Sequence, residues 1–244
     1  MWKMITAITP TGDRPLAFAL CQRWMSQQTM KPDQWLVIDD GAVPLEPVIS
    51  MDYVRRERRP EDPIVTLIAN LRMALPLIRG DMIVIIEDDE YYAPGYIRAM
   101  ADQLAAHEVV GIRCSKYYHL PTGKWANIGN RGHASLAETG FRASFLPAFD
   151  KELRGDTYLD IRLWRSIGKR GYLFGDEQSS LYLGIKGLPG RPGIGLGHNP
   201  RMYRAIDPHR AILRQFTGTD SRIYLDILNG ALTTENYKAY FRWA

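Results

Sequence analysis

The sequence predicts an α/β domain built on a mostly parallel sheet flanked by helices, and two observations carry this prediction. Three short apolar runs rich in β-branched residues, at 4–8, 34–38 and 82–86, are each followed by polar or acidic residues, as buried parallel strands are. The segments between them, 15–28 and 63–79, place apolar residues at helical spacing. Alternating strands and helices indicate parallel pairing through right-handed crossovers.

The rest of the chain extends this pattern and then departs from it. Pro76 is expected to kink or end the second helix, because proline cannot continue helical hydrogen bonding. No linker or internal repeat stands out, so the sequence predicts a single domain. The further elements expected, in order, are a helix over 96–106, a strand over 109–114, loops and irregular strands over 115–149, a helix over 159–167, a strand over 171–174, a Gly/Pro-rich loop over 188–199 and helices from 210 onward.

Composition excludes several classes of protein. With 244 residues, 45% hydrophobic and 24% charged, the chain can bury a sizeable core and is not disordered. Its apolar runs are far shorter than the ~20 residues of a membrane span, and no signal peptide is evident, so we expect no integral membrane contact. Cys21 and Cys114 form no CxxC pair, which excludes a disulfide framework and favours the cytoplasm. The net charge of +4, with 23 Arg and 8 Lys, mildly favours a phosphate-bearing partner over a merely solvated surface.

The strongest local signal is the acidic run Glu87-Asp88-Asp89-Glu90, directly after the third apolar run. Ligands of parallel sheets bind at the carboxyl ends of the strands. Side chains alternate in an extended segment, so Glu87 and Asp89 can point the same way. Like charges this close repel one another unless a cation neutralises them, and hard divalent cations take oxygen ligands. The run is therefore either a divalent metal site or a solvated acidic turn.

Two further polar segments follow the other predicted strands. Asp39-Asp40-Gly41 ends the second strand, where a carboxylate can accept hydrogen bonds from a nucleobase or a ribose, although Asp-Gly is also a common turn. The first strand runs into Thr-Pro-Thr-Gly-Asp-Arg-Pro at 9–15. Its hydroxyls and backbone N–H groups precede a helix and suit an anion, but the segment is neither a GxGxxG fingerprint nor a P-loop.

Together these segments resemble the N-terminal half of a GT-A glycosyltransferase of the family 2 type. The matching motifs are the Thr-Pro-Thr-x-x-Arg-Pro turn at 9–15, Gln28-Thr29, the Asp-Asp-Gly at 39–41, Asn70, Gly80-Asp81, the strand with its acidic run at 83–90 and the Pro-Gly-Tyr at 94–96. The family usually has Asp where this chain has Glu87, so Asp89 carries more weight as a metal ligand. The resemblance implies a GT-A (Rossmann-like) fold in which residues 1–114 bind a nucleotide sugar and 115–244 form the acceptor-binding and catalytic half.

The resemblance also implies roles for individual residues. In the second half, the family's Glu-Asp-x-Asp-Leu-x-x-Arg segment matches 155–162, with Asp156 at the general-base position and Asp160 as the substitute. Asp156 is alternatively only a helix N-cap. His198 follows a glycine-rich loop, as the last metal ligand does in such enzymes, and a purely structural histidine is the alternative. The donor-binding set is Thr9, Pro10, Thr11, Arg14, Asp39, Asp40, Asn70, Asp88 and Arg191, and the metal set is Glu87, Asp89 and His198.

The function implied is a metal-dependent transfer of a sugar from a nucleotide-diphosphate sugar, with a UDP-sugar favoured, to a hydroxyl acceptor. Mn²⁺ or Mg²⁺ would stabilise the leaving diphosphate, and a carboxylate base would make the displacement inverting. An isoelectric point near 9.0 and Arg-rich stretches favour a hydroxymethylated base in DNA as acceptor. A saccharide or lipid-linked glycan acceptor, a sugar nucleotidyltransferase and a non-catalytic DNA-binding protein are the alternatives, and the oligomeric state is open.

Overall fold

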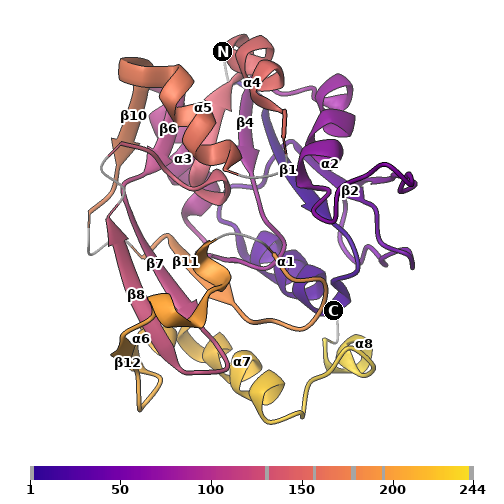
Figure 1. The fold of residues 1–244 in the computed structure, drawn as a ribbon, viewed down its shortest axis with the longest axis vertical. Helices are drawn as coiled ribbons and strands as arrows, with labels where there is room; N and C mark the ends of the chain where they lie inside the picture. Colours follow the sequence, from indigo (N-terminus) through magenta and orange to yellow (C-terminus); the bar gives the residue numbers. More distant parts are fainter. Residues whose placement is uncertain (1–2, 130–131, 156–157, 177–179, 194–195, 242–244) are drawn as a thin grey trace.

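The computed structural model describes residues 3–129, 132–155, 158–176, 180–193 and 196–241. Within this part of the chain, helices pack on two β-sheets (Figure 1). No helix in these ranges is both long and apolar enough to cross a membrane.

The larger sheet has seven strands, and its centre is the parallel set that the apolar runs predict. Side chains of β1 alternate between the two faces, with Ile5 and Ala7 in one core cluster and Ile8 in the other. Across the sheet the strands lie in the order β10 (Gly171–Phe174), β6 (Val109–Ile112), β9 (Thr139–Arg142), β4 (Met82–Ile85), β1 (Ile5–Thr11), β2 (Gln34–Asp39) and β3 (Asp52–Arg55).

The smaller sheet has five strands and lies beside the first. All of its neighbouring pairs are antiparallel apart from β7 and β11, which run parallel. The strands lie in the order β12 (Ala205–Ile206), β8 (Lys124–Gly129), β7 (Cys114–His119), β11 (Tyr182–Lys186) and β5 (Tyr91–Tyr92).

The prediction of one mostly parallel sheet is therefore wrong, because there are two sheets and both are mixed. The segment 115–149, expected to be irregular, forms the β7–β8 hairpin and then β9. In that hairpin Cys114 lies opposite Gly129, so the chain returns to the end of the larger sheet that it left after β6. Strand β9 must then start at this end, and it runs antiparallel to both β4 and β6.

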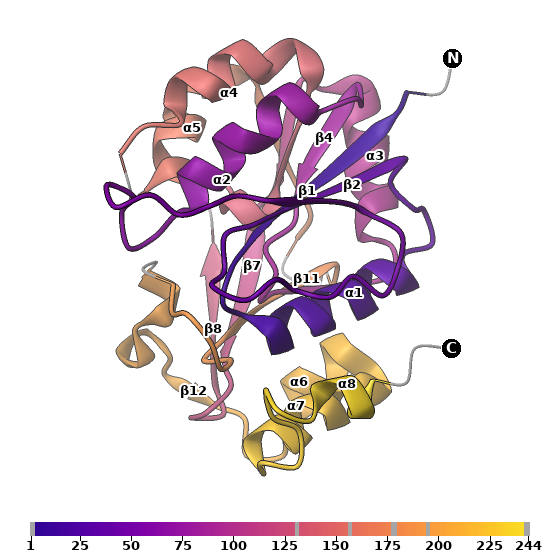
Figure 2. The same ribbon diagram turned by 90° about the vertical axis from the view of Figure 1, so that its right-hand side faces the viewer.

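Helices cover both faces of the larger sheet (Figure 2). The side with α1 (Pro15–Gln27) and α3 (Tyr96–Ala106) also carries α6 (Ala211–Thr217), α7 (Ser221–Leu228) and α8 (Tyr237–Tyr240), whereas the opposite side carries α2 (Leu67–Ala74), α4 (Leu146–Glu152) and α5 (Leu159–Ile167). The predicted helices 96–106 and 159–167 are confirmed to the residue. The helix expected over 63–79 is shorter: α2 ends at Ala74, and Pro76 lies in the 3₁₀ turn Leu75–Leu77 that follows.

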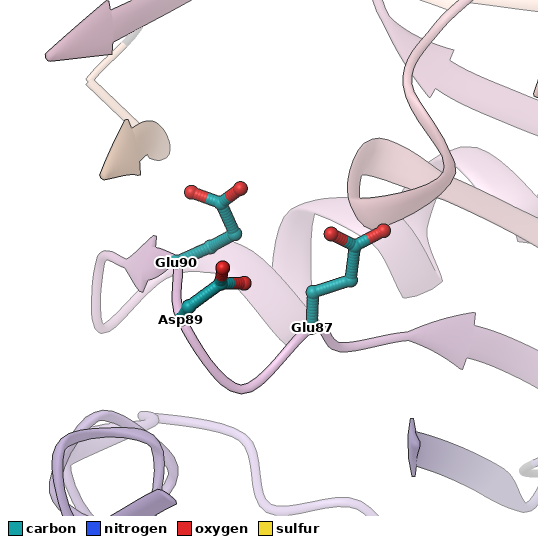
Figure 3. Close-up of side chains that lie close together, drawn as sticks. All are labelled: Glu87, Asp89 and Glu90. Carbon is teal, nitrogen blue, oxygen red and sulfur yellow. The ribbon is translucent and has the colours of Figure 1, made fainter. Parts of the chain in front are cut away.

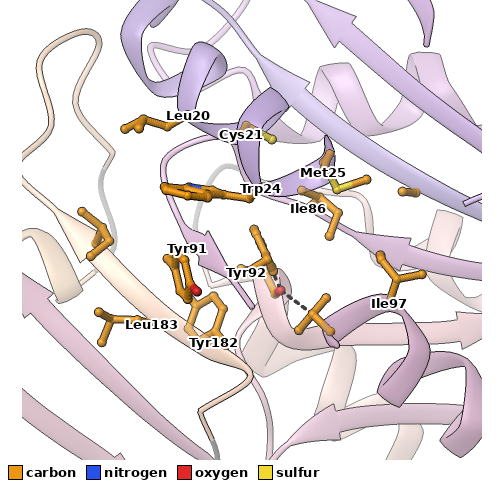
Figure 4. Packing of buried hydrophobic residues seen from close by; sticks show 14 of the residues in the cluster. Leu20, Cys21, Trp24, Met25, Ile86, Tyr91, Tyr92, Ile97, Tyr182 and Leu183 are labelled. Atoms are coloured by element: carbon orange, nitrogen blue, oxygen red, sulfur yellow. Dashed lines mark hydrogen bonds between the residues drawn. The ribbon is translucent and has the colours of Figure 1, made fainter. Parts of the chain in front are cut away.

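An aromatic cluster joins the two sheets beneath α1 (Figure 4). The indole of Trp24 meets the ring of Tyr91 edge-on at 5.0 Å and stacks on Tyr224 of α7 at 6.1 Å. The ring of Tyr92 lies 5.6 Å from that of Tyr182 on β11. Because Tyr91 and Tyr92 directly follow the acidic run, this packing fixes the end of the segment that carries the carboxylates.

Candidate active site

A cavity of about 540 Å³ opens at the carboxyl ends of β1 and β4. Its position follows the general rule for ligand sites in open α/β sheets, and its volume is in the range of small-molecule sites. The lining comes from separate parts of the chain: residues 10–14, 64–70, the acidic run 87–90, 133–137 with Tyr117, 158–161, and 182–202 in part. Both halves of the sequence therefore contribute residues to the lining of the cavity.

Three carboxylates converge on this cavity (Figure 3). Glu87, Asp89 and Glu90 each place one oxygen within 4.8 Å of the others. Burial raises the pKa of Glu87 to about 8 and the pKa of Glu90 to about 7. Burial acts the same way on Asp89, but Arg14 and Lys186 outweigh it and lower the pKa of that carboxyl. The Oδ1 atom of Asp89 is buried and has no hydrogen-bond partner among the described residues.

Two cations of the chain contact the acidic run. One guanidinium nitrogen of Arg14 lies 2.9 Å from Asp88 and 3.0 Å from Asp89. The ammonium group of Lys186 forms an ion pair with Glu90. When all four carboxylates of the run are ionised, these two cations leave a formal charge of minus two, which one divalent ion would balance, and a bound cation would itself favour the ionised form of Glu87 and Glu90. That charge, the oxygen donors and the orphaned Asp89 oxygen together fit Mn²⁺ or Mg²⁺.

His198, the predicted third ligand, lines the cavity but does not belong to the group of three carboxylates. Burial, together with the nearby Lys186, lowers its pKa to about 4, so the imidazole is neutral near pH 7. The neutral ring is the form that binds metals. Glu90, which the sequence analysis placed in the acidic run but not in the metal set, is grouped in the structure with Glu87 and Asp89.

Of the predicted donor-binding residues, six line the cavity. Thr11 donates from its hydroxyl to Asp88, with 2.6 Å between the oxygens, and accepts a 3.1 Å hydrogen bond at its carbonyl from the side chain of Asn70. These bonds tie the ends of β1 and β4 to the start of α2. The six residues on the cavity are Pro10, Thr11, Arg14, Asn70, Asp88 and Arg191.

Asp39 and Asp40 do not line the cavity but organise the loops around it. Fully buried Asp39 accepts hydrogen bonds from the backbone N–H groups of Gly41 and Leu45 and pairs with Arg55 at 2.5 Å. Asp39 is the last residue of β2, and its side chain holds the start of the connection between β2 and β3 instead of facing the cavity. Thr9 is likewise buried inside β1, where it accepts a hydrogen bond from the indole N–H of a tryptophan at 2.9 Å.

Asp40 has two cationic partners. One of its oxygens lies 2.5 Å from Arg191, and the other lies 2.8 Å from Arg56. Although burial raises the pKa of Asp40, its hydrogen bond to Arg191 is the chief opposing cause, and the pKa lies below its ordinary value. Arg191 itself lines the cavity, so Asp40 contributes to the site by holding this arginine in place.

Of the two candidates for the general base, Asp160 and Asp156, only Asp160 is among the described residues. Asp160 lines the cavity in the first turn of α5, where its side chain accepts a 2.9 Å hydrogen bond from the backbone N–H of Ile161. Asp156 lies outside the described residues. Tyr158, which precedes α5, also lines the cavity and is 56% exposed, with a φ of 54°.

Sequence reasoning missed two buried groups near the cavity. Lys186 ends β11, a strand that was not predicted, and the available signal was a lysine closing the apolar run at 181–185. Glu138 is fully buried, accepts hydrogen bonds from the hydroxyls of Ser115 and Ser135, and keeps a second oxygen without a partner in the described chain. The Ser-x-x-Glu spacing from Ser135 resembles a helix capping box and was the signal for it.

The fold and the site define an α/β protein with a GT-A-like fold and an acidic site at the strand ends. No protein-family model and no curated protein matches the sequence. Among solved structures, the chain is similar to TarS 1-349 of S. aureus in complex with UDP, with a TM-score of 0.54 and 11% identity over 97% of this chain and 78% of that one. Similar values hold for the complex with UDP-GlcNAc, with a TM-score of 0.50 and 10% identity over 98% and 76%.

A third match is the crystal structure of S. aureus TarS 1-349, with a TM-score of 0.53 and 11% identity. This match covers 75% of the present chain, which spans 60% of that chain's length. At identities this low the similarity shows the fold alone.

Proposed function

We propose that this protein is a glycosyltransferase that moves a sugar from a UDP-sugar to a hydroxyl group of a saccharide with the help of a divalent cation. The observation that carries the proposal is the carboxylate group Glu87, Asp89 and Glu90 on a cavity at the strand ends. A site of this kind combines oxygen ligands for a metal with room for a nucleotide sugar. The complexes of TarS with UDP and UDP-GlcNAc support the choice of donor.

In this proposal the first half of the chain, 1–114, binds the donor. Thr11, Arg14 and Asn70 line the cavity next to the acidic run and present a hydroxyl, a guanidinium and an amide. Arg191 from the second half lines it too, held by Asp40. Guanidinium groups match phosphate oxygens in charge and geometry. These residues would therefore fix the diphosphate beside the carboxylates.

Glu87, Asp89 and Glu90 would hold the divalent ion, with neutral His198 close to them on the cavity wall. The bound ion would act as a Lewis acid that stabilises the charge of the leaving UDP. Mn²⁺ and Mg²⁺ both suit this set of oxygen ligands, and an imidazole ligand tilts the preference towards Mn²⁺.

The second half, 115–244, would bind the acceptor and supply the base. Asp160 lines the cavity and would remove the proton of the acceptor hydroxyl as the anomeric carbon is attacked, which gives inversion. The alternative base is Asp156. Tyr117 and Tyr158 also line the cavity, and in this proposal a pyranose face would stack on an aromatic ring there.

A saccharide acceptor is favoured over DNA by the pairing of two arginines from the Arg-rich stretch 55–59. Arg55 is paired with Asp39, and Arg56 is paired with Asp40. Binding a phosphate backbone needs arginines free on one face. These two are instead paired with the protein's own carboxylates.

The proposal is tested by incubating the purified protein with Mn²⁺ and each common UDP-sugar and measuring UDP release with and without a panel of mono- and oligosaccharides. We expect release to be stimulated by a saccharide and to fall roughly 100-fold or more in Asp89→Asn. Asp150→Asn, an exposed aspartate on α4, is the matched control and should keep wild-type turnover. If only hydroxymethylated DNA stimulated release, the proposal of a saccharide acceptor would be wrong. If the protein formed pyrophosphate from UTP and a sugar phosphate, the proposal of glycosyl transfer would be wrong.

A further inference from the structure

Lys186 is a buried cation on the wall of the cavity. It is the last residue of β11, its exposed fraction is 6%, and it lines the cavity beside the acidic run. Lysine is almost never this buried without a partner, because removing an ammonium from water costs several kcal/mol. The contacts that hold it should therefore indicate what it is for.

Three neighbours fix the position of this ammonium group. Glu90 forms the ion pair, and its other oxygen accepts a 2.6 Å hydrogen bond from the backbone N–H of Ile185. The ammonium nitrogen lies 5.6 Å from the centroid of the Tyr117 ring. A methyl group at Gly197 would lie 3.2 Å from the Lys186 side chain, so the loop packs closely against it. The cation is held rigidly before any ligand arrives.

Arg14 and Lys186, the two cations that contact the acidic run, differ in the number of carboxylates that each contacts. Arg14 contacts both Asp88 and Asp89. Among the described residues, Lys186 has a hydrogen bond to Glu90 alone, although an ammonium group has three donors. The ion pair with Glu90 provides the ammonium group with a single counter-charge. Lys186 therefore has donors left for a further anion in the cavity.

We propose that Lys186 is a catalytic residue that contacts the β-phosphate of the donor. This inference rests on the proposed function and goes beyond it in assigning the leaving group a protein cation in addition to a metal. As the acceptor oxygen forms its bond to the anomeric carbon, the bond from that carbon to the β-phosphate oxygen breaks, and its electron pair stays with UDP. The acceptor's proton passes to the carboxylate base. Lys186 keeps its protons and stabilises the charge that grows on the β-phosphate.

The test compares the binding of UDP with that of uridine, which lacks both phosphates, by calorimetric titration with Mg²⁺ and again with EDTA. The variant is Lys186→Met, which keeps the aliphatic stem. Because it leaves Glu90 unpaired, the double variant Lys186→Met/Glu90→Gln is measured as well. We expect UDP to bind roughly 10- to 100-fold more weakly to both variants and uridine to bind within about 2-fold of the wild type.

Lys116→Met is the matched control, since Lys116 lies on the neighbouring strand β7, over the ring of Phe216 and outside the cavity. Equal losses for UDP and uridine, or no loss for either ligand, would overturn the role of Lys186. A loss that vanishes in EDTA would overturn it too, because Lys186 would then act only through the metal. If the wild type bound neither UDP nor uridine, the assignment of a UDP-sugar as the donor would be wrong. The proposed function would then fail, rather than this inference alone.

Discussion

The guanidinium of Arg191 forms a 2.5 Å ion pair with Asp40, a carboxylate that lies 151 residues earlier in the sequence and has no exposed side-chain surface. The same guanidinium approaches Asp13 at 4.0 Å, and the Arg191 carbonyl accepts a 2.7 Å hydrogen bond from Arg14. The Gly/Pro-rich loop is therefore fastened to the strand ends of the N-terminal half by charge and hydrogen bonding.

Removing Arg191 should destabilise the fold. Breaking a buried ion pair from one side costs about 3–5 kcal/mol, and because Arg56 remains on Asp40, we expect Arg191→Ala to lower the free energy of unfolding by about 2 kcal/mol. The matched control is Arg222→Ala, whose arginine is 85% exposed and lies 3.9 Å from Asp226. Exposed pairs contribute little, so its change should stay under about 0.5 kcal/mol. Urea unfolding measures both, and equal changes would contradict the role of the Asp40 pair.

Glu138 should make stability depend on pH. Burial raises the pKa of this carboxyl to about 8, whereas an unfolded glutamate ionises near 4.5. Between these values the unfolded chain binds fewer protons than the native one, so the free energy of unfolding falls as pH rises. The side chain of Glu138→Gln stays neutral at every pH. The free energy of unfolding of this variant, measured with urea, should therefore rise relative to that of the wild type between about pH 5 and about pH 8. Glu46→Gln, at a side chain 65% exposed, should show no such trend. If the difference in unfolding free energy between Glu138→Gln and the wild type did not change with pH, the raised pKa of Glu138 would be refuted.

Tyr158 should be strained. Its φ of 54° lies in the left-handed region, which costs a non-glycine residue about 1 kcal/mol or more, and its side chain is 56% exposed. We expect Tyr158→Gly to raise the free energy of unfolding by about 1 kcal/mol. Tyr172→Gly, in a strand and stacked on His107, should lower it by a similar amount. A thermal or urea melt in which both variants are destabilised would show that Tyr158 is not strained.

Asp160 should act on the acceptor and not on the donor. We expect Asp160→Asn to lower saccharide-dependent transfer roughly 100- to 10,000-fold, the usual contribution of a general base, while UDP binding stays within about 2-fold. Asp156→Asn is measured in parallel. Loss of transfer in Asp156→Asn with full activity in Asp160→Asn would reverse the assignment of the base.

The central strands and most of the helices could be predicted because their sequence patterns are local. Runs such as 82–86 are apolar on both faces, and 96–106 carries a clear helical repeat. The smaller sheet could not be predicted in the same way. Strands β5 and β12 have two residues each and exist through pairing with β11 and β8, which lie far away in the sequence. The periodicity of apolar residues is a local pattern, and it cannot predict pairing between strands that lie far apart in the sequence.

The site shows the same division. The acidic run was predicted as a site because it directly follows an apolar run that indicates a buried strand. The partners that decide its chemistry, Arg14 and Lys186, reach it from 74 and 96 residues away. Asp39 lies at a strand end as predicted, but its partners Tyr53 and Arg55 come from the neighbouring strand, 14 and 16 residues further along the chain, and had no signal in the sequence.

The acidic run is also one of the connections between the two sheets. The chain leaves the larger sheet at Ile85 and enters the smaller one at Tyr91, so the five residues 86–90 bridge them. Trp24 and Tyr182 brace the far end of this bridge through Tyr91 and Tyr92. A shift of one sheet against the other is thus transmitted straight to the carboxylates. Substitutions in the β7–β11 region, remote from any nucleotide, can in this way tune the geometry of the acidic group.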